Sequence, residues 1–150
     1  MITQEDKMLL IKDLSSRLPY AVHVQHISGV SGILHDISIY HKYDENDNIC
    51  DAICYTDFLG DGDNITIEHF KPYLFPLSSI TEGQKNHISQ LLLDVQIEYS
   101  PYEEDYDNLL ASSVKQANAL INYCLANHLD INSLIEKGLA IDATGLNIYK

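Results

Sequence analysis

Residues 49–58 have the sequence ICDAICYTDF, in which apolar and β-forming side chains occupy both odd and even positions. Successive side chains of a strand point to opposite faces of its sheet, so this pattern is typical of a strand that is covered on both faces. We therefore expect residues 49–58 to form a central strand. Such a strand commits the chain to a sheet with a packed layer against it.

Segments in which apolar and polar residues alternate lie on either side of this strand. They are found at residues 22–25, 33–39 and 65–67. Glycines and acidic turn residues separate them, including the hairpin signal Asp61-Gly62. Four short strands joined by turns predict an antiparallel meander of about four strands.

A helix is expected before the meander. Thr3 is a good N-cap for it, and Pro19 should end it near Leu18 because the residue before a proline disfavours the α conformation. Its apolar face is formed by Met8, Leu9, Ile11 and Leu14.

Two more helices are expected after an extended connector that contains Pro72 and Pro76. Thr81 and Gln84 form a capping box at the start of the second helix, and the third covers about residues 108–128. The buried stripe of the second comprises Ile88, Leu91, Leu92 and Val95. That of the third comprises Leu110, Val114, Ala117, Leu120, Ile121, Cys124 and Leu125. Residues 139–141 are expected to add an edge strand.

Together these elements predict one α+β domain over residues 1–150. It consists of an N-terminal helix, the meander, and two C-terminal helices that pack on one sheet face. Hydrophobic residues make up 45% of the chain, which is enough for a packed core.

The formal net charge of -13 bears on partners and location. A chain this acidic is repelled by nucleic-acid phosphates and by anionic lipid, so we expect neither as a direct partner. The chain starts with polar residues and has no long apolar stretch, which predicts a cytoplasmic protein. Its three cysteines are an odd number, which predicts free thiols.

Several stretches resemble those of a known family. Residues 2–7 are ITQEDK, residues 17–20 are RLPY, residues 71–79 are KPYLFPLSS, and residues 134–140 are LIEKGLA. In these stretches the chain resembles a family of small uncharacterised proteins from gut Bacteroidales and their phages or mobile elements. The resemblance implies a bacterial, cytoplasmic and phage-related setting, and it carries no activity or functional residue with it.

Two cation sites can be drawn from the sequence. Cys50, Cys54, Cys124 and His128 include the residue types of a zinc site, but a strand would hold Cys50 and Cys54 roughly 13 Å apart. Buried free thiols explain these cysteines better. Asp57, Asp61 and Asp63 crowd one hairpin, where Leu59 replaces a ligand of the calcium-loop pattern. We expect a solvated hairpin tip there, with a cation at these aspartates as the alternative, and no cofactor.

Catalytic motifs are weak. The sequence has no Gly-x-Ser-x-Gly elbow, and its glycine pairs lack a phosphate-binding lysine. A small hydrolase or metal-dependent enzyme would have to use His35, His69 or the Asp61/Asp63 hairpin, and it predicts a pocket in which these groups converge. A non-enzymatic protein is the preferred hypothesis.

The acidic segment after the second helix offers a partner-binding surface instead. Carboxylates and tyrosines alternate there, at Tyr99, Tyr102, Glu103, Glu104, Asp105, Tyr106 and Asp107. Tyrosine is enriched in interfaces, and negative charge steers basic partners. The hypothesis is a protein–protein interaction module with a basic protein partner. Its special case is a DNA mimic, which requires the carboxylates of this segment and of the 57–64 hairpin to form one face.

Overall fold

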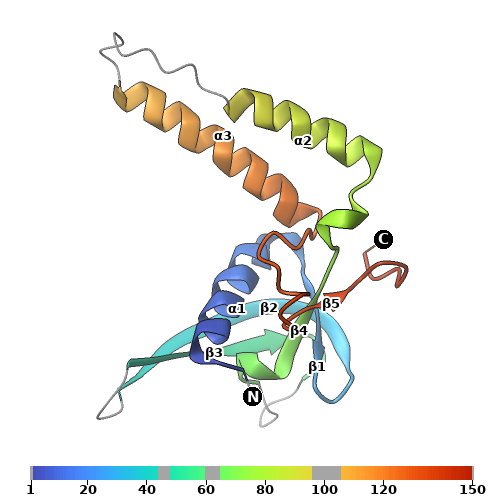
Figure 1. The fold of residues 1–150 in the computed structure, drawn as a ribbon. Coiled ribbons are helices and arrows are strands. Elements are labelled where there is room, and N and C mark those ends of the chain that lie inside the picture. Colours follow the sequence, from blue (N-terminus) through green and yellow to red (C-terminus); the bar gives the residue numbers. More distant parts are fainter. Residues whose placement is uncertain (1, 44–47, 60–64, 96–105, 150) are drawn as a thin grey trace.

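The computed structural model describes residues 2–43, 48–59, 65–95 and 106–149. Its α-helices are α1 (Gln4–Arg17), α2 (Glu82–Val95) and α3 (Tyr106–Ala126). Its strands are β1 (His23–His26), β2 (Ser31–Tyr43), β3 (Asn48–Thr56), β4 (Phe70–Leu74) and β5 (Ile141–Asp142), and short 3-10 turns include η1 (Leu18–Tyr20), η2 (Ile67–His69) and η3 (Leu77–Ser79). The chain is an α+β protein, as expected from the sequence (Figure 1).

The sheet is mixed and has the strand order β3-β2-β1-β4-β5. The expected antiparallel meander is correct for β1, β2 and β3 only. β4 returns to the other side of β1, where Val24 lies opposite Pro72, and β5 then pairs with β4 in parallel. The prediction of a four-strand meander was therefore wrong in its last step.

β3 lies at one edge of the sheet, so its prediction as the central strand was wrong. Its buried residues, Cys50, Ala52 and Cys54, belong to the core beneath α1. Its free edge is partly closed by the segment before η2, because Ile53 bridges Thr66 and the Cys54 amide donates to the Ile65 carbonyl at 2.7 Å. Cys50, Ala52 and Cys54 share one face of the strand, whereas Tyr55 on the other face is 46% exposed.

β4 lies mostly within residues 71–79, which were expected to be an extended connector. A strand was expected at residues 65–67 instead, and the structure has the 3-10 turn η2 from Ile67. Pro72 argued against a strand, since prolines lie mainly at sheet edges. β5 pairs only at Tyr73 and Leu74, so at Pro72 the strand has a neighbour on one side alone.

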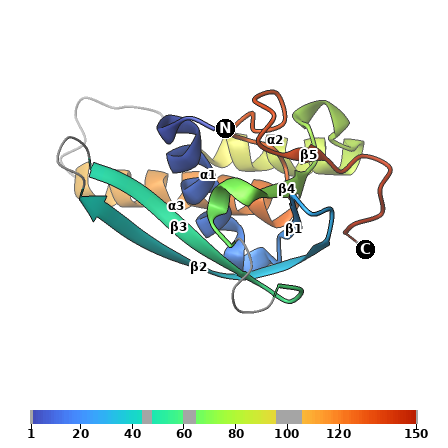
Figure 2. The ribbon, with the colours of Figure 1, turned by 90° about the horizontal axis from the view of Figure 1, so that it is seen from below.

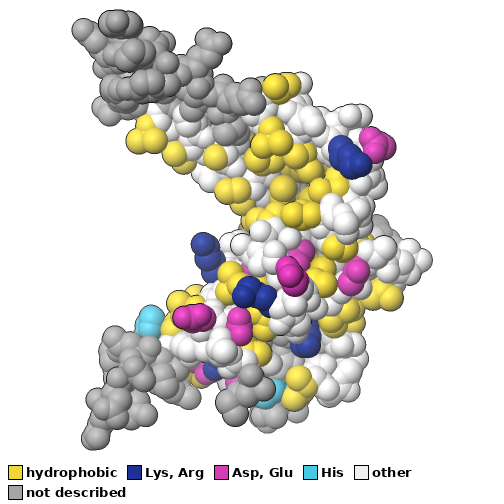
Figure 3. Space-filling model, in the orientation of Figure 1, with side chains coloured by type: hydrophobic (Ala, Val, Ile, Leu, Met, Phe, Trp, Pro, Cys, Tyr) yellow, Lys and Arg dark blue, Asp and Glu magenta, His cyan; other side chains and the backbone are white. Residues whose placement is uncertain are grey.

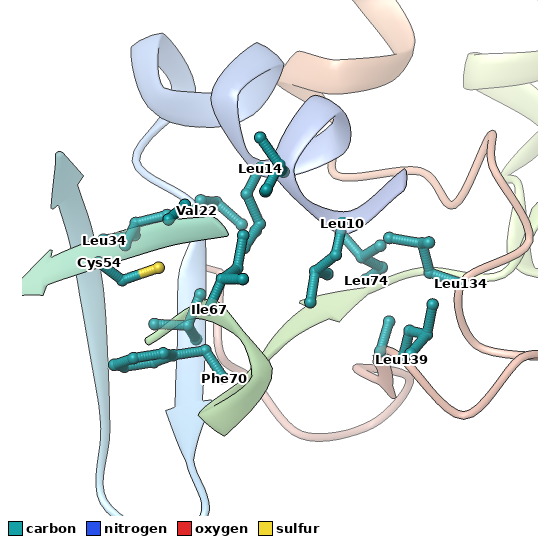
Figure 4. Packing of buried hydrophobic residues seen from close by; sticks show 14 of the residues in the cluster. Leu10, Leu14, Val22, Leu34, Cys54, Ile67, Phe70, Leu74, Leu134 and Leu139 are labelled. Atoms are coloured by element: carbon teal, nitrogen blue, oxygen red, sulfur yellow. The ribbon is translucent and has the colours of Figure 1, made fainter. Parts of the chain in front are cut away.

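α1 covers the sheet. Its start is capped as predicted, because the Asp6 amide donates to Thr3 Oγ1 at 3.0 Å. Leu10 and Leu14 point from α1 into a core that includes Ile67 and Phe70 (Figure 4). Met8, expected in this face, is 44% exposed, and Leu10 takes its place.

α2 and α3 pack against each other and project away from the sheet (Figure 1). Seen from below, β2 and β3 lie in front of the helices (Figure 2). The prediction that both C-terminal helices pack on a sheet face was wrong. The chain after α3 turns back to the core instead, and the residues that it buries are Leu129, Leu134, Leu139, Ala140 and Ala143.

Candidate functional site

The most distinctive feature is the helix pair α2 and α3, which we call the arm. The capping box that starts α2 is confirmed, since Thr81 and Gln84 exchange hydrogen bonds of 3.0 and 3.2 Å. Gln84 also reaches Asn127 at 3.4 Å, and the His87 ring lies 4.3 Å from that of Tyr123. These contacts fix the two helices in an antiparallel register near the sheet.

The base of the arm is tied to the sheet by backbone hydrogen bonds. The Phe75 amide donates to the His128 carbonyl at 2.9 Å, and the Asp130 amide donates to the Phe75 carbonyl at 2.8 Å. The buried Asp130 carboxylate then accepts from the amides of Leu134 and Ile135, which shapes the returning chain. These hydrogen bonds hold the end of α3 beside the end of β4.

A buried ion pair lies beneath this base. Arg17 donates to both carboxylate oxygens of Asp13, at 2.7 and 3.0 Å, and both side chains are fully buried. Arg17 also donates to the Leu129 carbonyl at 2.8 Å, and Asn132 donates to Asp13 at 2.8 Å. α1 therefore holds the residues that follow α3. This cluster was not predicted from the sequence, where its only signal is the i,i+4 spacing of Asp13 and Arg17.

His128 and Tyr149 form a second part of the base. Their rings stack at 3.5 Å, and the Tyr149 hydroxyl accepts from the His23 amide and donates to the Tyr73 carbonyl. Burial, with smaller contributions from Arg17 and His23, lowers the pKa of His128 to about 4. Burial raises the pKa of Tyr149 to about 12. Both rings are therefore neutral at pH 7.

His128→Asn is expected to flatten the pH dependence of stability. The pKa of His128 is 6.5 before burial and about 4 in the folded protein. Between these values the unfolded chain binds a proton that the folded chain does not, so stability is lost as the pH falls. We expect the wild type to lose about 1 to 2 kcal/mol more than the variant between pH 7 and pH 5.

Asparagine suits this position because His128 has a φ of 56°, which asparagine tolerates better than most residues. Urea unfolding at pH 7, 6 and 5 measures the difference. Parallel pH profiles for the two proteins would show that His128 is not shifted in this way.

The outer surface of the arm is apolar. Leu92, Leu110, Val114 and Ile121 are 48%, 67%, 50% and 45% exposed, and we call these four residues the arm face. Three of them were expected in the buried stripe of the third helix and one in that of the second, so that prediction was wrong for this set. Hydrophobic side chains gather over both helices, while charged ones are few (Figure 3). Among the described residues, no helix is long and apolar enough to cross a bilayer.

The acidic segment expected to bind a partner lies between α2 and α3 in the sequence. Tyr99, Tyr102, Glu103, Glu104 and Asp105 lie outside the described residues. Tyr106 and Asp107 were expected in the loop, but they form the first turn of α3. β3 and η2, which border the 57–64 hairpin, lie at the opposite end of the molecule from the tip of the arm (Figure 1).

The 57–64 hairpin gives no cation geometry in the part that is described. Asp57 uses a carboxylate oxygen to accept from the Ile33 amide at 3.0 Å. Asp61 and Asp63 lie outside the described residues, so that site stays a prediction. Within residues 2–43, 48–59, 65–95 and 106–149, no three His, Cys, Asp or Glu side chains are grouped to hold a metal ion.

The cysteines are buried thiols. Burial, with the nearby Asp51 carboxylate, raises the pKa of Cys54 to about 12. Burial also raises the pKa of Cys124, against the opposing effect of Arg17. Since the thiolate is the reactive and metal-binding form, these two side chains are poorly suited to nucleophilic or ligand chemistry.

The histidines proposed for a hydrolase do not meet. His35 is exposed at the β-bulge between Leu34 and Asp36. His69 Nδ1 forms a hydrogen bond of 2.7 Å with the Thr66 hydroxyl. The His69 side chain also lines a hollow of about 250 Å³, together with His26. The described lining of that hollow does not include His35.

No family model, curated protein or solved structure matches the chain significantly. The resemblance to proteins of gut Bacteroidales therefore stays a prediction.

Proposed function

We propose that the protein is a non-enzymatic interaction module that presents its acidic segment, Tyr99–Asp107, to a basic protein partner. The observation that carries this proposal is the arm. Its two helices cover no sheet face, since α1 and the returning chain cover the core. The arm is buried against the body at the end of α3, at Cys124 and Leu125.

The composition of the segment supports the same assignment. Six carboxylates and no basic residue lie between Asp94 and Asp107, together with three tyrosines. Tyrosine contributes large contact area at a small loss of side-chain entropy, and clustered carboxylates raise the association rate with basic proteins. The arm carries the ends of this segment away from the body, where a partner has access.

The test is affinity capture of partners with two variants of equal charge. Glu103→Gln/Glu104→Gln/Asp105→Asn neutralises the segment. Glu5→Gln/Glu82→Gln/Glu136→Gln neutralises three exposed carboxylates elsewhere, and either variant changes the net charge from -13 to -10. We expect a basic protein to be retained by the wild type and by the second variant, and to be lost or weakened at least about tenfold with the first.

Raised salt should release the same protein, because exposed charges are screened beyond about 10 Å at 0.1 M ionic strength. Equal binding by both variants would overturn the proposal. Competition by DNA for the captured protein would favour the DNA-mimic alternative.

A further inference from the structure

We propose that the arm face is the contact between two copies of this chain, which pair through α3 to form a four-helix bundle. This inference goes beyond the proposed function, because it concerns the apolar side of the arm rather than the acidic segment at its end.

α3 has two apolar stripes, and only one of them is used along its length. The first stripe includes Leu120 and Tyr123, and it faces α2. The second includes Leu110, Val114 and Ile121, with Leu125 as its last member. Leu125 is buried where α3 meets the body, whereas the other three are about half exposed or more. A helix of a four-helix bundle needs two such stripes, one for its hairpin partner and one for the next hairpin.

The spacing of the second stripe fits pairing with another helix. Leu110, Val114, Ala117 and Ile121 follow one another at intervals of four, three and four residues, which is the heptad pattern of coiled coils. The β-branched Val114 and Ile121 occupy equivalent positions, and Leu110 and Ala117 occupy the others.

α2 widens this surface. The Gln84–Asn127 and His87–Tyr123 contacts set the register of the arm, and they place Leu92 at a level between Val114 and Ile121. Leu92 lies about 80° around α2 from Gln84, so it borders the α3 interface rather than facing away. A hollow of about 720 Å³ runs along α3, and its lining joins Leu110 and Val114 of the arm face to the polar side chains of Lys115, Asn118 and Asn122.

The size of the surface is in the range of a weak dimer. α3 has 21 residues and α2 has 14, so they are about 31 Å and 21 Å long, and each is about 10 Å wide. The projected face is therefore roughly 500 Å², and the accessible area of side chains on a helix face is larger. Stable interfaces bury about 800 Å² per partner, and weaker ones less than about 600 Å².

Charge points to a second copy as the occupant. The helices of the arm carry Glu82, Lys85, Asp94, Asp107 and Lys115, a net charge of -1, which leaves -12 for the rest of the chain. A basic partner would be drawn to the rest of the surface, whereas the arm face attracts no charge of either sign. Two copies that meet at this face bring together their least charged surfaces and keep their acidic bodies apart.

The test is the mass in solution by sedimentation velocity, over a concentration series of the full chain. We expect a particle of 33.8 kDa, twice the 16.9 kDa of one chain, with a dissociation constant below roughly 100 µM. Leu110→Glu/Val114→Glu should raise that constant at least about 100-fold. The control is Leu93→Glu, which removes an equally exposed leucine about 180° around α2 from Gln84 and should leave the dimer intact.

Salt separates this contact from binding of a basic partner. Screening weakens the repulsion between two chains of charge -13, so added salt should tighten the dimer while it releases a basic partner. Circular dichroism checks that the variants keep their helix content. A wild type that stays monomeric at roughly 0.5 mM, or equal dissociation by the Leu93→Glu control, would overturn the dimer and would leave the proposed function untouched.

Discussion

Arg17→Met is expected to destabilise the protein by about 3 to 5 kcal/mol, because it leaves the Asp13 carboxylate buried without its counter-ion. Asn132 still donates to Asp13, but the Leu129 carbonyl at the base of the arm loses its donor. Urea unfolding at pH 7 gives the loss. Hydrogen exchange should show, in addition, faster exchange of the amides at the end of α3 than in the wild type.

Two further variants make this prediction specific. Asp13→Leu/Arg17→Met removes both charges and is expected to cost less than Arg17→Met alone, since no unpaired charge is then buried. Lys85→Met breaks the exposed ion pair with Glu82 and should change stability by less than about 1 kcal/mol. A loss below about 1 kcal/mol for Arg17→Met would mean that the pair does not hold the arm to α1.

Leu14→Ala is expected to cost about 2 to 5 kcal/mol, because Leu14 is fully buried between α1 and the sheet and its removal leaves a cavity. Leu110→Ala should cost less than about 1 kcal/mol in the monomer, since Leu110 is 67% exposed on the arm. The comparison is made by urea unfolding at protein concentrations low enough to avoid self-association.

This pair of variants distinguishes the observed fold from the arrangement expected from sequence, in which α3 packs on the sheet. In that arrangement Leu110 would be buried, and its truncation would be nearly as costly as that of Leu14. Met8→Ala serves as the control within α1, because Met8 is 44% exposed and its truncation should have a small effect. Equal losses for Leu14 and Leu110 would contradict the account of the arm.

Local signals determined much of the secondary structure. The Thr3 cap, the Thr81 and Gln84 capping box and the proline after α1 act through neighbouring residues, so the sequence alone fixed where α1 and α2 begin and where α1 ends. Alternation of apolar and polar residues predicted β1 and β2. The edge strand near residues 139–141 was also found, as β5.

Tertiary contacts decided the rest, because they depend on residues far apart in the chain. Apolar residues on both faces of residues 49–58 predicted a central strand. In the structure this strand lies at the sheet edge, where it bridges Thr66 and packs its buried residues against α1. β4 was not predicted because a proline disfavours a strand that is paired on both sides. In the structure β5 pairs with Tyr73 and Leu74 and ends before Pro72, so Pro72 has a neighbouring strand on one side only. Arg17, which pairs with Asp13, donates to the carbonyl of Leu129, which lies more than a hundred residues later in the sequence.

The sequence by itself determined the α+β class, most helix starts, the acidic charge and the acidic segment between α2 and α3. It also showed that both helices have apolar stripes, which periodicity always reveals. Only the tertiary structure decided what those stripes touch. The returning chain and α1 fill the sheet face first, and the arm is left with an apolar surface, because burial is settled by competition among all segments of the chain.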